Sequence, residues 1–448
     1  MFSRRDFAKS IFRTSLATFG SPLWMHQLSA NAFAETPTTG GYKAIVVVSM
    51  PGGNDTNNLL IPMDTVEYGE YNALRSSVAI PQSQCNVLSG LINNVSYGMH
   101  PSLINVSQLY NQRKAIVVAN VGPLKSPITK AQLTINPALE PEALLSHPAG
   151  AAQWESATTL ALPPTGWGGR IADLMSQQSG LLPPIMNAGS PASIFTVGNS
   201  VQGIVLQAQT YNYVSLPVGI DAAMLAIAQV DSNSQNNIIA QAAKLRTTAI
   251  QQQQLVAQAQ SAGGTLQTVF PTTNFGQELQ AIASVMNGRS VVGASRQMFY
   301  CQQGLGTYDT HASQLSTHAS ALTEFDGGIG AFMQALEEMG LANQVLVCTH
   351  SDFNRTMTSN SSGGTDHGWG SHQLIIGSGI SGGQVIGTLP ELAIGGPTDL
   401  NGYGIWIPTL SATQMTAAIG KWMGLTNAQL ATVFPDLANF PSGAITIS

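Results

Sequence analysis

The side chains best suited to chemistry are Asp and His residues gathered in the carboxyl-terminal third of the chain. The stretch GGTDHGWGSHQLIIG, residues 363–377, places Asp366, His367 and His372 among glycines, directly before an apolar run. Five of the eight histidines lie between residues 311 and 372. Charged residues make up only 9% of the 448 residues, compared with about 25% in an average soluble protein. A local concentration of ionisable groups in such a chain indicates a functional site.

Two further Asp/His pairs and one earlier Asp follow apolar runs. GTYDTH contains Asp309 and His311, and CTHSDFNR contains His350 and Asp352. Asp55 comes after the first apolar run, in VVSMPGGNDTNNLLIP. In an open α/β sheet, ligands bind outside the carboxyl ends of the strands. These positions are therefore expected at one edge of a sheet.

Carboxylate and imidazole groups without thiolates form the ligand set of zinc, manganese and other divalent cations. Taken singly, each residue has a structural alternative, because Asn54-Asp55 is also typical of a turn and a lone histidine is more often structural. The three clusters and Asp55 together favour a site for one or two divalent ions, with zinc or manganese as the expected metal. We expect the following residues to converge on it: Asp55, Asp309, His311, Asp352, Asp366, His367 and His372.

The elements that must position these residues alternate between short apolar runs and helical patterns. The run ALTEFDGGIGAFMQALEEMG has apolar residues at three- and four-residue spacing and ends at Gly340, which is typical of an amphipathic helix. Short β-branched runs suit strands that are buried on both faces of a mainly parallel sheet. Alternation of the two predicts a doubly wound α/β fold. The expected strands are residues 42–50, 114–122, 296–303, 344–350 and 372–377.

We expect a single domain over residues 35–448 with a helical insertion at about 222–262. The insertion lacks strand signals and is rich in Ala and Gln, which favour helix. Two roles remain open for it: a cap over the site, or a helical pair packed elsewhere.

The amino terminus has the parts of a twin-arginine export signal in order. Arg4 and Arg5 precede a mildly apolar stretch, and Ala32-Phe33-Ala34 supplies a small-x-small cleavage site before Glu35. An amphipathic amino-terminal helix of the fold is the alternative interpretation. Removal of residues 1–34 predicts a periplasmic or secreted protein that folds before export.

Charge and apolar content exclude several classes of protein. Residues 35–448 contain 13 Lys and Arg against 22 Asp and Glu, a formal net charge of −9, whereas nucleic-acid binding needs clustered positive charge. No other stretch approaches the roughly 20 apolar residues of a membrane helix, so no transmembrane anchor is expected after signal cleavage. Cys85, Cys301 and Cys348 are too few for a disulfide framework.

Through a series of motifs in a specific order, the sequence resembles a family of sulfatase-like proteins of unknown function. This family is exported by the twin-arginine route and belongs to the alkaline phosphatase superfamily. The resemblance covers nearly the whole chain after the signal. It is carried by GGNDTNNLLIP, HPSLINVSQLYNQRKAIVVANVGP, LLSHPAGAAQWES, GWGGRIADLM, RQMFYCQQGLGTYDTHASQ, THSDFNRT, GTDHGWGSH and GIWIPTLSATQ. It implies an alkaline phosphatase-like α/β fold.

The resemblance also implies metal ligands. It assigns Asp55 after the first strand, the pair Asp309 and His311 before a long helix, and Asp352 in THSD, with His367 or His372 closing the site. The pattern departs from the superfamily in three ways. Asp309 and His311 are closer together than in several members, Phe353 stands where a phosphatase would have His, and Asn354 stands where Gly is common. These departures affect a second metal more than the first, and Asp366-His367 can supply the missing imidazole.

The same resemblance places a nucleophile at a helix start, where the helix dipole favours an alkoxide and an incoming anion. Ser146 in EALLSHPAGAAQWES is the candidate, with an ordinary N-cap as the alternative. His147 beside it is a candidate ligand, oxyanion donor or proton shuttle. Arg170 and Arg355 either grip an anionic substrate or pair with a carboxylate. Cys85 lacks the Cys-x-Pro-x-Arg context of formylglycine sulfatases.

Two functions from different classes follow. The first is an exported metal-dependent hydrolase of phosphate, sulfate or related esters, acting on an anionic ester or envelope glycan. The second is a sulfatase-like protein that binds or assembles envelope components without turnover, together with an exported protein partner. Fold alone does not decide between them.

Overall fold

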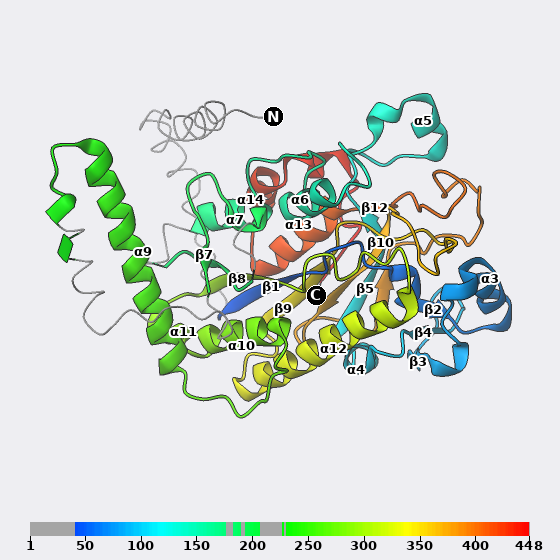
Figure 1. Cartoon of the computed structure of the whole chain (residues 1–448), viewed down its shortest axis with the longest axis horizontal. Helices are drawn as coiled ribbons and strands as arrows, with labels where there is room; N and C mark the ends of the chain where they lie inside the picture. Colours follow the sequence, from blue (N-terminus) through cyan, green and yellow to red (C-terminus); the bar gives the residue numbers. More distant parts are fainter. Residues whose placement is uncertain (1–40, 176–181, 190–192, 207–225, 228–229, 448) are drawn as a thin grey trace. The chain divides into compact units, whose positions relative to one another are not determined.

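The computed structural model describes residues 41–447 except 176–181, 190–192, 207–225 and 228–229 (Figure 1). The expected export signal, with Arg4 and Arg5, lies outside the described residues. Residues from Gly41 onward form one compact unit.

The framework of this unit is a nine-stranded sheet with the order β11-β5-β10-β9-β1-β8-β6-β7, in which β12 also pairs with β5. Neighbouring strands are parallel except where β10 pairs with β5 and β9. The five predicted strands correspond to β1, β5, β8, β9 and β10, so the mainly parallel α/β sheet is confirmed. The strands are β1 Lys43–Ser49, β5 Ala115–Gly122, β6 Ile185–Asn187, β7 Ile204–Val205, β8 Arg296–Gln302, β9 Val345–His350, β10 Ser371–Ile376, β11 Gln384–Ile386 and β12 Leu410–Ser411.

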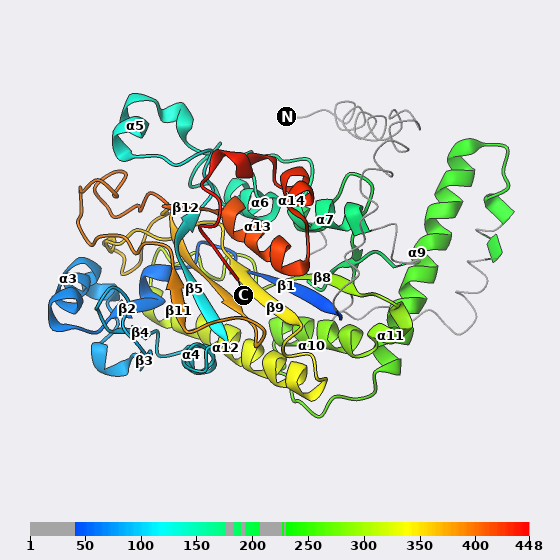
Figure 2. The ribbon, with the colours of Figure 1, turned by 180° about the vertical axis from the view of Figure 1, so that it is seen from behind.

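Helices cover both faces of the sheet, as β1 illustrates. Val46 and Val48 pack into one hydrophobic core, while Ile45 and Val47 point into the other, because successive side chains of a strand alternate between faces. The first core includes α4 Ile104–Asn111, α10 Asn274–Asn287 and α12 Gln314–Glu338. The second includes α6 His147–Ser156, α7 Trp167–Met175, α13 Ala412–Met423 and α14 Asn427–Val433. Figure 2 shows the two layers from behind.

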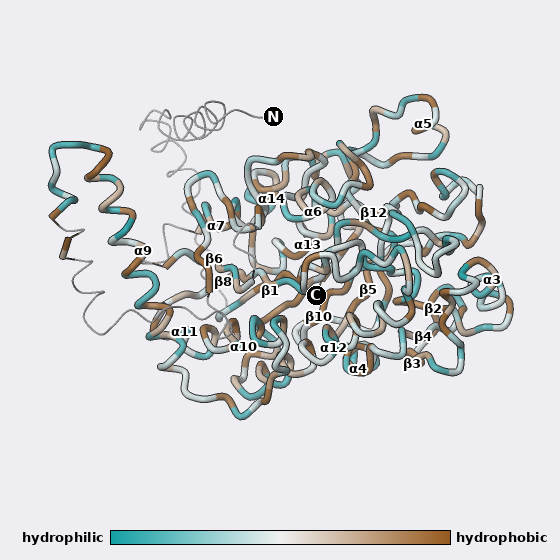
Figure 3. Tube along the Cα trace, viewed as in Figure 1, coloured by the Kyte–Doolittle hydropathy of each residue, from teal (hydrophilic) through white to brown (hydrophobic). Residues whose placement is uncertain are grey.

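The remaining elements lie at the periphery. The stretch predicted as a helical insertion contains α9 Asn237–Ala262, along which hydrophilic and hydrophobic residues alternate (Figure 3). The other helices are α3 Thr65–Arg75, α5 Lys130–Ile135 and α11 Arg289–Val292. A small sheet has the order β2-β4-β3, with β2 Leu60–Pro62, β3 Asn86–Val87 and β4 Tyr97–Met99. Among helices in the described part of the chain, none combines the length and apolar character needed to cross a bilayer.

The antiparallel direction of β10 decides which loops meet. The loops that follow β1, β8 and β9 lie at the carboxyl edge of the parallel strands, and β10 runs the opposite way beside β9. The residues that precede β10, including Asp366 and His367, therefore reach that same edge. Gly52 in the loop after β1 has φ +112°, and a Cβ there would lie 2.5 Å from the Asp309 nitrogen. A side chain at this position would prevent the first two loops from meeting.

A buried ion pair ties the loop after β1 to the rest of this edge. Asp55 accepts hydrogen bonds from Arg75 and Gln314, and neither member of the Asp55–Arg75 pair is exposed. Arg75 also donates to the carbonyl oxygens of Thr356 and Met357, at 3.0 and 3.1 Å. The Asp55 carboxylate therefore does not reach the expected metal site. Its pair with Arg75 holds α3 against the loop after β1 and the loop after β9.

His372 is likewise a core residue. It is the second residue of β10, and its Nδ1 accepts a hydrogen bond of 3.0 Å from the Asn120 N–H. Burial lowers the pKa of His372 to about 4, against a small opposing contribution from Asp55. The structure therefore does not bring His372 to the cluster formed by its neighbours, because its side chain lies within the sheet rather than in the loop before it.

Replacement of Arg75 by Met should strongly destabilise the fold, because it leaves the Asp55 carboxylate buried without a counter-charge. We expect the free energy of unfolding to fall by about 3–5 kcal/mol, measured by denaturant titration. Lys114→Met is the control: Lys114 pairs with Glu337 at 2.8 Å on the surface, and its loss should cost at most about 1 kcal/mol. Equal effects of the two substitutions would contradict the role assigned to the Asp55–Arg75 pair.

His372 should also make stability depend on pH. Because its pKa is about 4 in the fold and about 6.5 in an unfolded chain, the unfolded state binds the proton first as pH falls. The unfolding free energy should therefore decrease between pH 6.5 and 4, by up to about 1.4 kcal/mol per pH unit for this residue. His372→Asn keeps an acceptor for Asn120 and should show a shallower slope. Parallel pH profiles for the two proteins would show that His372 is not buried in its neutral form.

Candidate metal centre

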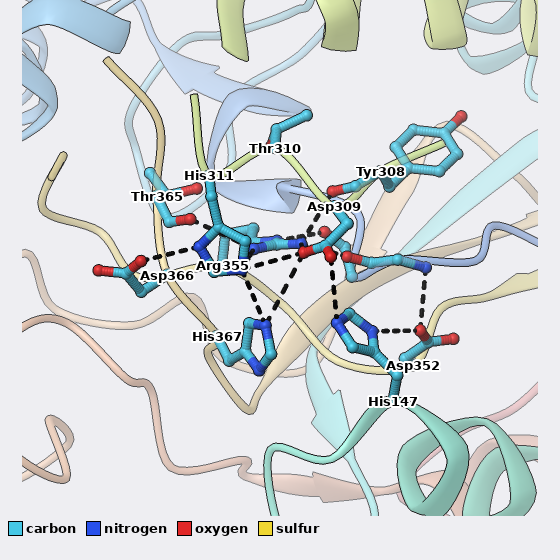
Figure 4. Close-up of polar contacts among 12 residues, drawn as sticks. His147, Tyr308, Asp309, Thr310, His311, Asp352, Arg355, Thr365, Asp366 and His367 are labelled. Carbon is cyan, nitrogen blue, oxygen red and sulfur yellow. Dashed lines mark hydrogen bonds and ion pairs between the residues drawn. The ribbon is translucent and has the colours of Figure 1, made fainter. Parts of the chain in front are cut away.

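Four side chains from three segments converge at the carboxyl edge of the sheet (Figure 4). His147 is the first residue of α6, Asp309 and His311 lie in the loop between β8 and α12, and His367 lies in the loop before β10. Asp352, two residues after the end of β9, lies directly behind His147. Gly150 allows this approach, because a Cβ at that position would lie 2.2 Å from the Asp352 carbonyl oxygen.

The outer nitrogen of each imidazole contacts an acceptor oxygen. Nδ1 of His147 lies 2.8 Å from Asp352 Oδ2, and Nδ1 of His311 lies 2.9 Å from Asp366 Oδ1. A carboxylate accepts hydrogen bonds only, so in each neutral imidazole Nδ1 carries the hydrogen and Nε2 is an acceptor. This is the arrangement by which outer groups fix the tautomer of metal-binding histidines.

The third imidazole is held by the main chain. Nδ1 of His367 lies 2.8 Å from the carbonyl oxygen of Leu145. Leu145 itself has φ +69°, a left-handed conformation that is unfavourable for a residue with a side chain. Burial lowers the pKa of His367, and the charge of Arg355 lowers it further against the effect of the Leu145 hydrogen bond. A lowered pKa favours the neutral imidazole, which is the form that binds metals.

The inward-facing atoms have separations that fit a divalent cation. Nε2 of His147 lies 3.5 Å from Asp309 Oδ2, and Nε2 of His367 lies 3.8 Å from Asp309 Oδ1. Ligand atoms about 2.0–2.2 Å from a tetrahedral ion are separated by about 3.3–3.6 Å. Ligand atoms of His147, Asp309 and His367 all lie within 4.8 Å of one another. Nε2 of His311 is close as well, at 3.1 Å from both Asp309 Oδ1 and His367 Nε2.

Arg355 and Phe353 form the inner wall of this cluster. The Arg355 guanidinium is fully buried and hydrogen-bonded to Asp309. Burial raises the pKa of Asp309, but the hydrogen bond and charge of Arg355, with the neighbouring histidines, outweigh it and lower that pKa. Phe353 packs against His367 and His147, with ring centroids 4.4 and 4.7 Å apart. It fills the space behind the two imidazoles.

A cavity of about 380 Å³ opens beside His147, Asp309 and Asp352. Its wall includes Glu155 and Tyr300, whose hydroxyl donates to Glu155 at 2.6 Å. The other lining residues are Ser49, Pro51, Gly52, Pro148, Ala151, Ser193, Gln302, Leu305 and Gly306. Neither Lys nor Arg occurs among the described residues that line it. The sequence analysis did not identify this wall, because only the packing of α6 against β8 brings Glu155 and Tyr300 together.

The predicted site residues thus divide into three groups. Asp309, His311, Asp366 and His367 meet as expected, and His147, expected beside a nucleophile, joins them. Asp352 contacts the cluster through His147 and accepts from the Gly52 N–H at 2.9 Å. Asp55 and His372 are held elsewhere, as described above.

Ser146 is the N-cap residue of α6, and among the described residues its side chain makes no capping hydrogen bond. It is partly exposed and does not line the cavity. Arg170 donates to the carbonyl oxygens of Val433 and Ser156, at 2.8 and 2.6 Å, so it neither pairs with a carboxylate in these contacts nor reaches the cavity.

Several solved structures resemble the chain. A sulfatase, PsFucS1 from Pseudoalteromonas sp., is 10% identical, with 86% of this chain and 68% of that chain covered and a TM-score of 0.35. The lipoteichoic acid synthase LtaP from Listeria monocytogenes is 8% identical, with 89% and 76% covered and a TM-score of 0.36. The phosphonate monoester hydrolase of Agrobacterium radiobacter is 10% identical, with 86% and 74% covered and a TM-score of 0.34.

Comparison with curated proteins finds no match. The sequence does match a family model over residues 42–434, a range that includes every member of the cluster. The chain therefore belongs to the family described as Protein of unknown function (DUF1501).

Proposed function

We propose that this chain is an exported, metal-dependent hydrolase of phosphate, sulfate or related esters. One observation carries the proposal: three imidazoles are each held with Nε2 facing a shared carboxylate, beside a cavity large enough for an organic group. Without a cation, the acceptor nitrogens of His147 and His367 would face the Asp309 carboxylate oxygens at about 3–4 Å.

His147, Asp309 and His367 are the proposed ligands, with His311 beside them. Nitrogen and oxygen donors without a thiolate suit zinc or manganese. When bound, such an ion polarises an ester oxygen and lowers the pKa of a hydroxyl group or water. Asp352 and the Leu145 carbonyl orient the imidazoles, because each fixes the position of a ring and its tautomer.

The cavity is proposed to hold the organic part of the ester. Pro51, Pro148 and Leu305 supply apolar surface, while Tyr300 and Glu155 supply polar atoms at the wall. Glu155 is fixed there by hydrogen bonds from Tyr300, Ser193 and the Ile194 N–H. A rigid wall of this kind favours one orientation of the bound group.

Ser146 is the proposed nucleophile, with a water molecule as its competitor. Its hydroxyl is not used for capping α6, although it stands at the helix amino terminus next to His147. The helix dipole favours negative charge at that position.

A second function, binding or assembly of envelope components without turnover, is favoured by a different observation. Neither Lys nor Arg is present among the described residues of the cavity wall, and the Arg355 guanidinium is fully buried. An anionic ester would thus be bound without the cationic side chains that such groups commonly use. In this alternative the cluster binds an ion that holds the loops together.

Metal content should depend on the cluster and on the groups that orient it. We expect His367→Ala to lose the ion, and Asp352→Asn to bind it about 10–100-fold more weakly, because Asp352 only orients His147. Asp436→Asn, the same chemical change in the 3-10 helix Pro435–Asn439, is the control and should leave affinity unchanged. Elemental analysis and competition with a chelator measure these effects. Full metal content in His367→Ala would sink the ligand assignment.

The same proteins separate the two functions when they are assayed with aryl phosphate and aryl sulfate esters. The hydrolase predicts turnover that a chelator abolishes, and Ser146→Ala should then lose activity while it keeps the ion. Turnover that survives in Ser146→Ala would assign the attack to water. A wild-type protein that binds an ion but hydrolyses none of these esters would favour the binding function.

Export should depend on the paired arginines of the proposed signal. Substitution of both Arg4 and Arg5 by Lys should leave the precursor in the cytoplasm, because twin-arginine signals are recognised by a receptor. Cell fractionation and amino-terminal sequencing would test this. A double variant that still yields a mature chain beginning near Glu35 would contradict export by this route.

A further inference from the structure

We propose that Arg355 is a built-in cation that limits the cluster to a single divalent ion. The inference rests on the proposed metal centre and specifies it: the ion is held on the side of His147, while the His311–Asp366 side is closed to a second ion. Arg355 acts as a positioning residue, since its buried guanidinium has no exposed surface with which to touch a substrate.

The guanidinium stands where a second cation would have to bind. Figure 4 shows Arg355 between His311 and Asp309. One of its terminal nitrogens donates to Asp309 Oδ1, and the other lies 3.4 Å from Nε2 of His311. An ion shared by Asp309 and His311 would need the same oxygen and the same lone pair. Arg355 therefore competes with it both for ligands and through its charge.

Arg355 cannot readily move away, because the main chain uses its remaining donors. Nε donates to the Gly53 carbonyl at 2.9 Å, and the terminal nitrogens donate to the carbonyls of Gly52, Tyr308 and Thr365. These groups come from the loops after β1 and β8 and from the loop before β10. Displacement of the guanidinium would leave buried carbonyl oxygens without donors, which is costly. The positive charge is therefore a fixed part of the site.

The far side of the cluster is completed without an ion. His311 has Nδ1 against Asp366 and Nε2 against Arg355, so both ring nitrogens have protein partners. On the near side, Nε2 of His147 lies 3.5 Å from Asp309 Oδ2, and both are acceptors. The His311 side of the cluster thus has a hydrogen-bond donor from the protein, namely Arg355. The His147 side has acceptors that need a cation. The Asp55 carboxylate is likewise paired with an arginine, Arg75.

The stoichiometry of ion binding tests this inference. Protein stripped of metal is titrated with Zn²⁺ and with Mn²⁺, and bound ions are counted by calorimetry and by native mass spectrometry. We expect one ion per chain in the wild type. Asp366→Asn, at an exposed position, should also bind one ion, because the His311–Asp366 side of the cluster holds no metal.

Variants of Arg355 test whether the guanidinium is the cause. Arg355→Met removes the charge and should allow a second ion, whereas the matched variant Arg355→Lys keeps a positive charge and should still bind one. Circular dichroism establishes which variants fold. If Arg355→Met does not fold, the wild type and Asp366→Asn still decide whether the cluster binds one ion or two.

Two ions in the wild type, with one lost in Asp366→Asn, would overturn this inference and leave the proposed metal-dependent function intact. A folded Arg355→Met protein that binds only one ion would overturn the role of the guanidinium. The absence of any bound ion in the wild type would overturn both this inference and the proposed metal centre, so the two failures are distinguishable.

Discussion

The arrangement of loops at the carboxyl edge depends on the bonds of one buried guanidinium. Arg355 follows β9, yet its donors reach carbonyl oxygens in the loop after β1, the loop after β8 and the loop before β10. Hydrogen bonds from a charged group are stronger than those between neutral groups, and a buried carbonyl oxygen that loses its donor is costly. The same side chain then contacts Asp309. One residue therefore contributes both to the positions of these loops and to the charge of the cluster.

The direction of β10 supplies the second constraint. In an all-parallel sheet, a strand brings to the active edge only the residues that follow it. Because β10 is antiparallel to β9 and β5, it brings the residues that precede it, and Asp366 and His367 enter the site from that side. The loop from β9 to β10, residues 351–370, therefore begins and ends at this edge. The imidazoles of His147 and His367 can therefore both face the Asp309 carboxylate. Phe353 fills the space behind them.

Much of this could be predicted from the sequence. The run KAIVVVS predicted β1 because short β-branched runs suit a strand that is buried on both faces. The pairs Asp309/His311 and Asp366/His367 predicted a cluster because they flank strands. The ion pair of Asp55 could not be predicted, since its partner Arg75 lies in a separate helix that carries no motif. Nor could the burial of His372, because a strand predicted from residue 372 does not say which neighbour the side chain meets. The pairing of β10 with β5 places it against the Asn120 N–H. Glu155 and Tyr300 stayed hidden for a related reason: only the packing of α6 on β8 brings them together.

The hydrogen bond between Leu145 and His367 makes the site sensitive to a residue whose side chain takes no part in it. The acceptor is a main-chain carbonyl, so no substitution at position 145 can delete it, in contrast to the carboxylates behind His147 and His311. Its direction, however, depends on the left-handed backbone at Leu145. A β-branched residue there would favour an extended backbone and would turn the carbonyl away from His367. A substitution at this position could therefore abolish metal binding while every residue of the cluster stays the same. Glycine and asparagine tolerate the left-handed conformation, so they are the substitutions that should preserve the site.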